Sequence, residues 1–133
     1  MDNKWNFKIE LKSKASFDTL KNYYGVAIPE DLQRFIEEAN ASNPEKNLVK
    51  INGVERVFET VLSFNENEEE AITVFDIIKN DQFKTAVPFG MDPFGNIFYC
   101  TLTDSKVVFY NHEENLYEDA DCTIEQFISS LYS

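Results

Sequence analysis

Few residues in this sequence are of the types that carry out catalysis. His112 is the only histidine, and Cys100 and Cys122 are the only cysteines. A single histidine excludes a multi-histidine metal site, so a Cys–His pair is the nucleophilic arrangement to consider. The local signatures of papain-like and caspase-like enzymes are absent. We expect His112 to end a strand and to hydrogen-bond the backbone or an acidic neighbour such as Glu113.

The cysteines and glycines match no cofactor motif. Neither cysteine has a second cysteine at the C-x-x-C spacing. The four glycines form neither a G-x-G-x-x-G pattern nor a P-loop, so no cofactor is expected. The first residues lack the apolar run of a signal peptide, which predicts a cytoplasmic protein with two free thiols. We expect Cys100 to be a small buried hydrophobic residue in a strand.

Carboxylates are abundant and concentrate in two segments, residues 65–70 and 113–121. Neither segment has the ligand spacing and central glycine of an EF-hand loop, so no metal site is expected. A carboxylate pair for glycoside hydrolysis stays open, because 24 Asp and Glu residues offer many pairs. We interpret both segments as solvated acidic loops.

The charge of the chain is large and unevenly distributed. Its formal value is −12, from 24 acidic and 12 basic residues. Residues 1–25 hold five lysines against three acids, and no Lys or Arg follows Lys106. An acidic surface repels phosphate, so we expect no binding to nucleic acids or to membranes. A basic protein partner, a cation or solubility alone stay open as roles of this charge.

Aromatic residues gather in the last third of the chain. In a strand, Phe98 and Cys100 point to one face, and Ile97 and Tyr99 point to the other. We expect most of these aromatic residues in the core. Any tyrosines that stay exposed beside carboxylates would form an interface suited to a basic partner. The group comprises Phe94, Phe98, Tyr99, Phe109, Tyr110 and Tyr117.

Two helices are predicted before residue 44. The first has Ser16 as its N-cap and ends at Gly25, which suits the left-handed position after a helix. The second begins at Pro29, and the two acids that follow complement the helix dipole. Its apolar residues recur at helical spacing. They are Leu32, Phe35, Ile36 and Ala39.

Strand patterns dominate the rest of the chain. Asn52-Gly53 predicts a type I′ hairpin between Leu48–Ile51 and Val54–Phe64. Thr123 and Gln126 form a capping box for a closing helix. These patterns predict an α+β fold with helices around a largely antiparallel central sheet. We expect a single domain over residues 1–133, with residues 1–15 as an extension or a first strand. The remaining predictions are a helix at Ala71–Lys79, strands at Ala86–Phe89, Asn96–Leu102 and Lys106–His112, and a turn at Asp92–Gly95.

Several segments follow one another in an order that is similar to a known family. Val26–Ile36 has an apolar-Pro pair, then acids, then an apolar stripe. Val87–Phe98 has an apolar-Pro-Phe-small-x-Asp-x-x-Gly-Asn pattern, and Val107–Glu113 ends in Tyr-Asn-His-Glu. Together with the helix at Thr123–Tyr132, they resemble the SUKH superfamily, specifically its Smi/Knr-like family. The chain departs from the family pattern at residues 40–44, where Asn-Ala-Ser-Asn-Pro replaces an Asn-Gly-Gly turn.

The resemblance implies a compact fold with no established catalytic centre. Many bacterial members are immunity proteins, which neutralise a cognate polymorphic or contact-dependent toxin, often a nuclease. It also implies a mainly structural role for the residues of the family motif. These are Pro29, Pro88, Phe89, Asp92, Gly95, Asn96, Phe109 and His112.

We therefore predict a non-enzymatic immunity protein that occludes a basic toxin with its acidic surface. A basic toxin suits an acidic partner because opposite charges steer association. The alternative is a regulatory interaction scaffold of the Smi/Knr type, and the oligomeric state stays open. Each predicted contact residue has the alternative of being only a solvated side chain. They are Glu66, Glu68, Glu69, Glu70, Glu113, Glu114, Tyr117, Glu118 and Asp119.

Overall fold

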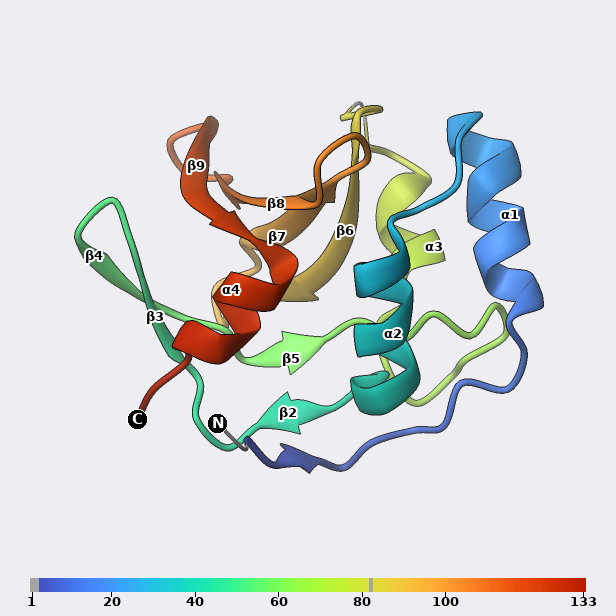
Figure 1. Ribbon diagram of the computed structural model, residues 1–133, viewed down its shortest axis with the longest axis horizontal. Helices are drawn as coiled ribbons and strands as arrows, with labels where there is room; N and C mark the ends of the chain where they lie inside the picture. The colour runs from blue at the N-terminus through green and yellow to red at the C-terminus, as the bar shows by residue number, and fades with distance from the viewer. Residues whose placement is uncertain (1–2, 82) are drawn as a thin grey trace.

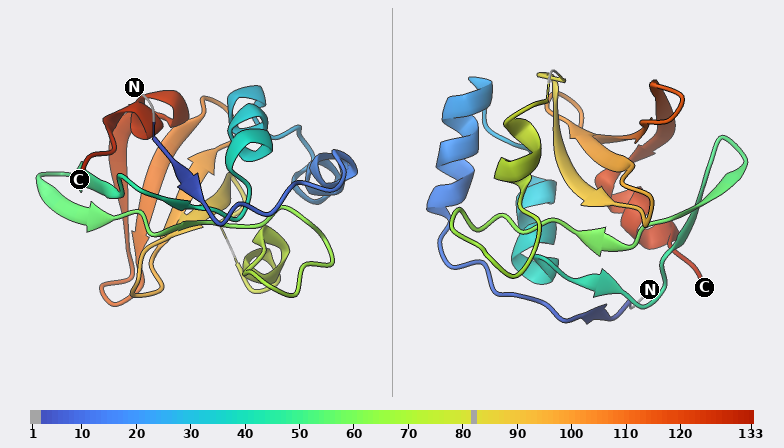
Figure 2. Two further views of the ribbon diagram at one scale, coloured as in Figure 1. Left: turned by 90° about the horizontal axis from the view of Figure 1, so that it is seen from below. Right: turned by 180° about the vertical axis from the view of Figure 1, so that it is seen from behind.

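The computed structural model describes residues 3–81 and 83–133. A five-stranded antiparallel sheet in the order β5-β6-β7-β8-β9 lies at its centre. Helices α2 and α4 cover one face of this sheet, and α3 lies on the other side (Figures 1 and 2). This arrangement confirms the predicted α+β class. The elements are β1 (Trp5–Asn6), α1 (Ala15–Tyr24), α2 (Glu30–Ala39), β2 (Asn43–Pro44), β3 (Leu48–Ile51), β4 (Val54–Val57), β5 (Thr60–Val61), α3 (Val74–Ile78), β6 (Ala86–Met91), β7 (Ile97–Thr101), β8 (Lys106–Asn111), β9 (Leu116–Thr123) and α4 (Ile124–Ser130).

The first two helices follow their apolar patterns closely. Helix α1 ends at Gly25, whose φ of 82° is the left-handed conformation predicted for it. The predicted N-cap at Ser16 is wrong, because the helix begins one residue earlier and Ser16 is buried within its first turn. Helix α2 has Pro29 at its N-cap, and all four residues of its apolar stripe are buried, as predicted.

The predicted hairpin is present, but its second strand is shorter than expected. Asn52 and Gly53 have φ values of 53° and 79°, as a type I′ turn requires. Strand β4 ends at Val57, and the chain then crosses to the central sheet, where β5 pairs with β6. Phe58 and Glu59 lie between the two strands, and the Phe58 side chain is fully buried. Burial of this ring therefore separates β4 from β5, which the sequence pattern had predicted to be one strand over Val54–Phe64.

The predicted helix at Ala71–Lys79 is also shorter in the structure. Helix α3 spans only Val74–Ile78 and is capped by Thr73, whose hydroxyl accepts from the Asp76 backbone N–H at 3.0 Å. The Asp76 carboxylate in turn accepts from the Thr73 backbone N–H at 3.1 Å. This reciprocal capping box fixes where the helix begins.

The acidic segment at residues 113–121 was predicted to be a solvated loop, and this prediction is wrong. Most of the segment belongs to the edge strand β9. Strand β9 pairs with β8 in antiparallel register, and Tyr110 lies opposite Tyr117 and Phe109 opposite Glu118. The expectation failed because charged residues mask the alternation of β9. Charged side chains on an exposed edge also discourage pairing with another chain.

One row of side chains crosses the helix-covered face of the sheet. The register aligns Gly90, Phe98, Phe109 and Glu118 on β6, β7, β8 and β9. The Phe58 ring lies over Gly90 and contacts Phe98 edge-on, with ring centroids 5.1 Å apart. It also meets Phe89 at 5.7 Å and Phe127 of α4 at 5.2 Å. Phe58 thus joins the sheet to α4.

We predict that Gly90→Ala destabilises the protein, because a methyl group there would overlap the Phe58 ring. Overpacking of a buried site costs about 1 to 3 kcal/mol, which urea unfolding measures. The matched test is a double-mutant cycle with Phe58→Leu, whose smaller side chain should relieve most of this cost. An unchanged cost of Gly90→Ala in the Phe58→Leu background would show that the ring is not the cause.

The turn at residues 40–44 contains a backbone conformation that favours glycine, although this chain has no glycine there. Ala41 has a φ of 56°, the left-handed region in which glycine is favoured. The Asn40 side chain holds this turn, because its carbonyl accepts from the Phe64 N–H at 2.7 Å and its amide donates to the Ile9 carbonyl at 2.9 Å. The buried amide thus ties the N-terminal segment to the chain beyond β5.

We predict that Ala41→Gly stabilises the fold by about 0.5 to 1 kcal/mol, since it relieves a left-handed alanine. Ala39→Gly is the matched control: it ends a helix with ordinary backbone angles and should destabilise by about 1 kcal/mol. Urea unfolding of both variants measures the difference. Destabilisation by Ala41→Gly would mean that lost packing of the buried methyl outweighs the strain.

Candidate functional site

The structure does not bring the two predicted acidic segments together. The loop at residues 65–70 lies beside α1, where the Thr19 hydroxyl donates to the Glu66 carboxylate at 3.1 Å. The turn at residues 113–115 and strand β9 lie on the opposite side of the molecule (Figures 1 and 2). The predicted contact residues therefore form two separate surfaces.

Two of the acids predicted as contacts, Glu68 and Glu118, are partly buried and bonded within the protein. The Glu68 carboxylate accepts from the Asn65 side-chain amide at 3.1 Å and from the Ser63 hydroxyl at 3.3 Å. The hydrogen bond from Asn65, followed by weaker ones, lowers the pKa of Glu68. Glu118 lies 3.5 Å from the Arg56 guanidinium and its side chain is only 11% exposed. These two acids stabilise the fold, whereas the other predicted acids are exposed: Glu66, Glu69, Glu70, Glu113, Glu114 and Asp119.

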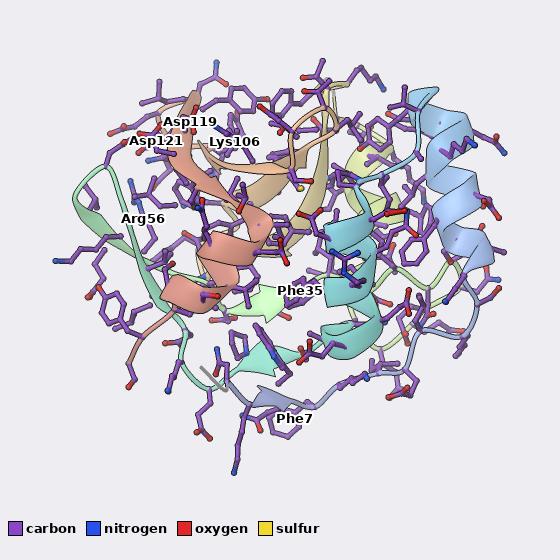
Figure 3. All side chains as sticks on the ribbon, in the orientation of Figure 1. Phe7, Phe35, Arg56, Lys106, Asp119 and Asp121 are labelled. Atoms are coloured by element: carbon purple, nitrogen blue, oxygen red, sulfur yellow. The ribbon has the colours of Figure 1, made fainter. Side chains whose placement is uncertain are left out.

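Arg56 connects the β3–β4 hairpin to the edge strand. Its guanidinium carbon lies 4.8 Å from the centroid of the Phe109 ring, in addition to its ion pair with Glu118. Figure 3 shows Arg56 between the hairpin and β9, with Asp119 and Asp121 toward the top of that strand in this view. A cation over an aromatic ring and beside a carboxylate is favourable in a partly dehydrated site. Arg56 therefore neutralises part of the acidity of β9.

The Asp-x-x-Gly-Asn segment of the family motif forms a hydrogen-bonded turn. One oxygen of the buried Asp92 carboxylate accepts from the backbone N–H groups of Phe94 at 2.9 Å and Asn96 at 2.8 Å. Its other oxygen accepts from the Asn96 side-chain amide at 2.8 Å. Asn96 then accepts from the His112 backbone N–H at 3.0 Å. These bonds tie the β6–β7 turn to the end of β8.

His112 lies one residue after the end of β8, where we expected it to end the strand, and its ring bonds the backbone, as predicted. Its Nε2 lies 2.8 Å from the Phe94 carbonyl oxygen, which only accepts, so Nε2 carries the proton. Gly95 completes the turn with a φ of 87°. The imidazole therefore closes the turn rather than activating a nucleophile.

The remaining motif residues are buried or cap a helix. Pro88, Phe89 and Phe109 lie in strands of the sheet and are buried. Pro29 precedes the first residue of α2 and cannot donate a backbone hydrogen bond, which costs nothing at that position. These placements support a structural role for the motif.

Both cysteines are free thiols, as predicted. Cys100 is fully buried in β7, and burial followed by the charge of Asp31 raises its pKa to about 12. Burial, and then Asp119 and Asp121, also raise the pKa of Cys122. A nucleophilic cysteine needs a lowered pKa, because the thiolate is the reactive form. Neither thiol is poised for catalysis.

A groove opens on the face of the sheet opposite α2 and α4. We call it the tyrosine groove. It has a volume of about 530 Å³ and runs between α3 and the strands β7, β8 and β9. The register places Ile97, Tyr110 and Tyr117 in one row across these strands, and Tyr99 belongs to the adjacent row. The residues of interest here are Asp76, Asp81, Ile97, Tyr99, Tyr110 and Tyr117.

Hydrogen bonds and ring contacts hold the tyrosines in place. The Tyr99 hydroxyl donates to Asp81 at 2.8 Å, and the Tyr110 hydroxyl donates to Asn115 at 2.7 Å. The Tyr110 and Tyr117 ring centroids are 4.5 Å apart, and Phe83 meets Tyr117 at 4.7 Å. Burial, followed by the carboxylate of Asp81, raises the pKa of Tyr117. Burial likewise raises the pKa of Tyr99, so the hydroxyls of Tyr99 and Tyr117 stay protonated at neutral pH beside a negative charge.

Sequence reasoning found Tyr117 and grouped the aromatic residues, but it missed the two aspartates of the groove. Asp76 lies in the first turn of α3 and Asp81 follows the helix, and nothing in the sequence relates them to strands that follow later. The predicted alternation correctly placed Ile97 and Tyr99 on the face opposite Phe98 and Cys100, whereas the acids predicted as contacts do not line the groove.

The described residues also bear on the kind of site that this domain presents. Within residues 3–81 and 83–133, no three His, Cys, Asp or Glu side chains gather as metal ligands would. None of the helices in that part of the chain has the length and apolar composition needed to cross a membrane. What the structure does present is an α+β domain with exposed acids and a fixed array of tyrosines. These features are typical of a protein-binding module.

The comparison with known families agrees with this class. Residues 14–128 match the SUKH_6 family, described as SMI1-KNR4 cell-wall. The match spans most of the chain, and the chain belongs to this family, which confirms the resemblance to the SUKH superfamily. Members of that superfamily are generally immunity or interaction proteins rather than enzymes. A search of curated proteins found no match.

We predict that a disulfide reagent at pH 8 labels Cys122 first and leaves Cys100 unreacted until the protein unfolds. With a pKa of about 12 for Cys100, only roughly one thiol in ten thousand is ionised at that pH. The Cys122→Ser variant is the control, since it isolates the reaction of Cys100. Rapid labelling of that variant in the native state would contradict the burial of Cys100.

Proposed function

We propose that this chain is an immunity protein that binds a basic bacterial toxin and occludes its functional surface. The observation that carries the proposal is membership of the SUKH_6 family in a chain with a charge of −12. SUKH proteins commonly bind toxin partners. A toxin that acts on nucleic acid must present positive charge to phosphate, so an acidic inhibitor is complementary to it.

The position of the free acids supports this function. The Lys- and Arg-free segment after Lys106 includes β9 and the turn before it, so its exposed carboxylates face solvent without cations in their own segment. A field of one sign accelerates association with an oppositely charged protein. The exposed acids Glu113, Glu114 and Asp119 are the contacts that we favour from this surface. We place the protein in the cytoplasm, where an immunity protein meets its toxin.

A regulatory scaffold of the Smi/Knr type is the second candidate. The favouring observation is the family match itself, whose description refers to the cell wall rather than to a toxin. A scaffold would bind a resident cellular protein. The genomic neighbourhood separates the two candidates, because an immunity gene lies beside the gene of its toxin.

We predict that co-expression of this chain rescues growth of cells that produce the C-terminal domain of the neighbouring toxin. The purified pair should form a complex whose association rate falls steeply between low and physiological salt, as expected for electrostatic steering. A matched pair of variants tests the surface. Glu113→Lys/Glu114→Lys should slow association more than Glu69→Lys/Glu70→Lys, which makes the same charge change on the other side of the molecule.

Absence of rescue together with absence of a complex at low salt would contradict the immunity function. Equal slowing by both double variants would show that net charge acts, rather than the surface near β9.

A further inference from the structure

We propose that the tyrosine groove binds an arginine side chain from a basic segment of the protein partner. The inference rests on the proposed function in one respect, that the partner is a basic protein. It assigns recognition of the partner to the tyrosine groove, which the acidic segments at residues 65–70 and 113–121 did not predict. Three properties of the groove carry it: flat aromatic faces, carboxylates at its wall, and the sign of its lining charge.

The aromatic floor of the groove is already organised. Tyr110 and Tyr117 pack with an interplanar angle of 35°, and Phe83 and Tyr99 extend the row of rings. Tyr117 is 46% exposed despite these contacts, so part of its surface is open to a ligand. A guanidinium group is planar and stacks on such rings, where the cation meets the negative π face. Little side-chain entropy is lost on binding because neighbouring rings already fix the tyrosines.

Asp81 supplies the carboxylate for this cation. One of its oxygens accepts from the Tyr99 hydroxyl at 2.8 Å, and the other accepts from the Phe83 backbone N–H at 2.9 Å. Each carboxylate oxygen has two acceptor positions, so each keeps one for a further donor. The two parallel N–H groups of a guanidinium match a carboxylate in this bidentate manner.

Asp76 adds a second negative charge on α3. Its carboxylate accepts from the Thr73 backbone N–H, which fixes its orientation at the start of the helix. The register of β8 and β9 also places Asp119 on the same face as Tyr117, two residues along the strand. Asp119 does not line the groove itself, and Lys106 of β8 lies on the same face, so the carboxylates of the groove are those of Asp76 and Asp81.

No cation among the described lining residues balances the charges of Asp76 and Asp81. Among the described residues that line it, none is a lysine, an arginine or the histidine. Glu118 differs from these aspartates, because it lies on the opposite face of the sheet and is paired with Arg56. An arginine from a partner would supply at Asp81 the kind of pairing that Arg56 supplies at Glu118. Arginine suits the groove better than lysine, which lacks a planar, bidentate head.

The test uses short capped peptides and the full chain. Acetyl-Gly-Arg-Arg-Gly-amide is titrated while backbone and tyrosine ring resonances are followed by NMR. We expect shifts at Tyr99, Tyr110 and Tyr117, with saturation in the millimolar range. The matched peptide contains citrulline, which keeps the shape of arginine without its charge, and it should bind at least about tenfold more weakly.

Matched variants locate the interaction. Asp76→Asn/Asp81→Asn should weaken binding of the arginine peptide about tenfold, and Tyr117→Leu about threefold. Glu45→Gln/Glu59→Gln raises the net charge by the same amount with exposed acids outside the groove, and should leave binding within about twofold. Circular dichroism confirms that each variant is folded. Equal weakening by both double variants, shifts that map elsewhere, or equal binding of the citrulline peptide would overturn the proposal.

Two further comparisons distinguish arginine binding in the groove from binding of a free amino acid and from the immunity function itself. Free L-arginine that binds as tightly as the peptide would make the groove a site for an amino acid, and would overturn binding of a protein segment. If the wild-type chain rescues growth and Asp76→Asn/Asp81→Asn binds the toxin equally well, the groove proposal fails while the immunity function stands. If the arginine peptide occupies the groove but no toxin is bound, the immunity function fails and the groove stands.

Discussion

The packing of the Phe58 ring against Gly90 is the contact on which the rest of the structure depends. Only a residue without a side chain leaves room for this ring on β6, and the register shifts between Pro88 and Gly90 to present it. From there Phe58 meets rings of the sheet and of α4. Close packing of this kind makes a buried site intolerant of added volume. The same ring draws the chain away from the β3–β4 hairpin and into β5.

The short segment that carries Phe58 also organises the edge of the sheet. Two residues earlier, Arg56 lies over Phe109 and pairs with Glu118. One stretch of chain therefore crosses the covered face from β6 to β9 and places an apolar ring at one end and a cation at the other. Without this cation, an acidic edge strand would hold a carboxylate on the core-facing side with no charge to offset its burial.

Covering one face in this way leaves the other face for recognition. Helices α2 and α4 and the Phe58 segment occupy the first face, whereas α3 reaches only the β6 side of the second. The strands β7 to β9 there expose tyrosines held by hydrogen bonds, next to aspartates of α3. The family turn at Asp92 and His112 keeps β6, β7 and β8 in register at one end. Structural rigidity and an open binding face thus come from the same packing.

The sequence by itself determined the helical stripe of α2, the Asn52-Gly53 hairpin, the capping box at Thr123, the α+β class and the family. Each of these depends on residues close together in the chain, where backbone preferences and periodicity act directly. Tertiary structure alone decided that the acidic segment after His112 is strand β9, that Phe58 interrupts a strand, and that α1 begins before Ser16. It also decided that Asp81 and Tyr117 share a groove while the two acidic runs lie apart. Such relations are set by packing and strand pairing between distant segments, which local sequence does not encode.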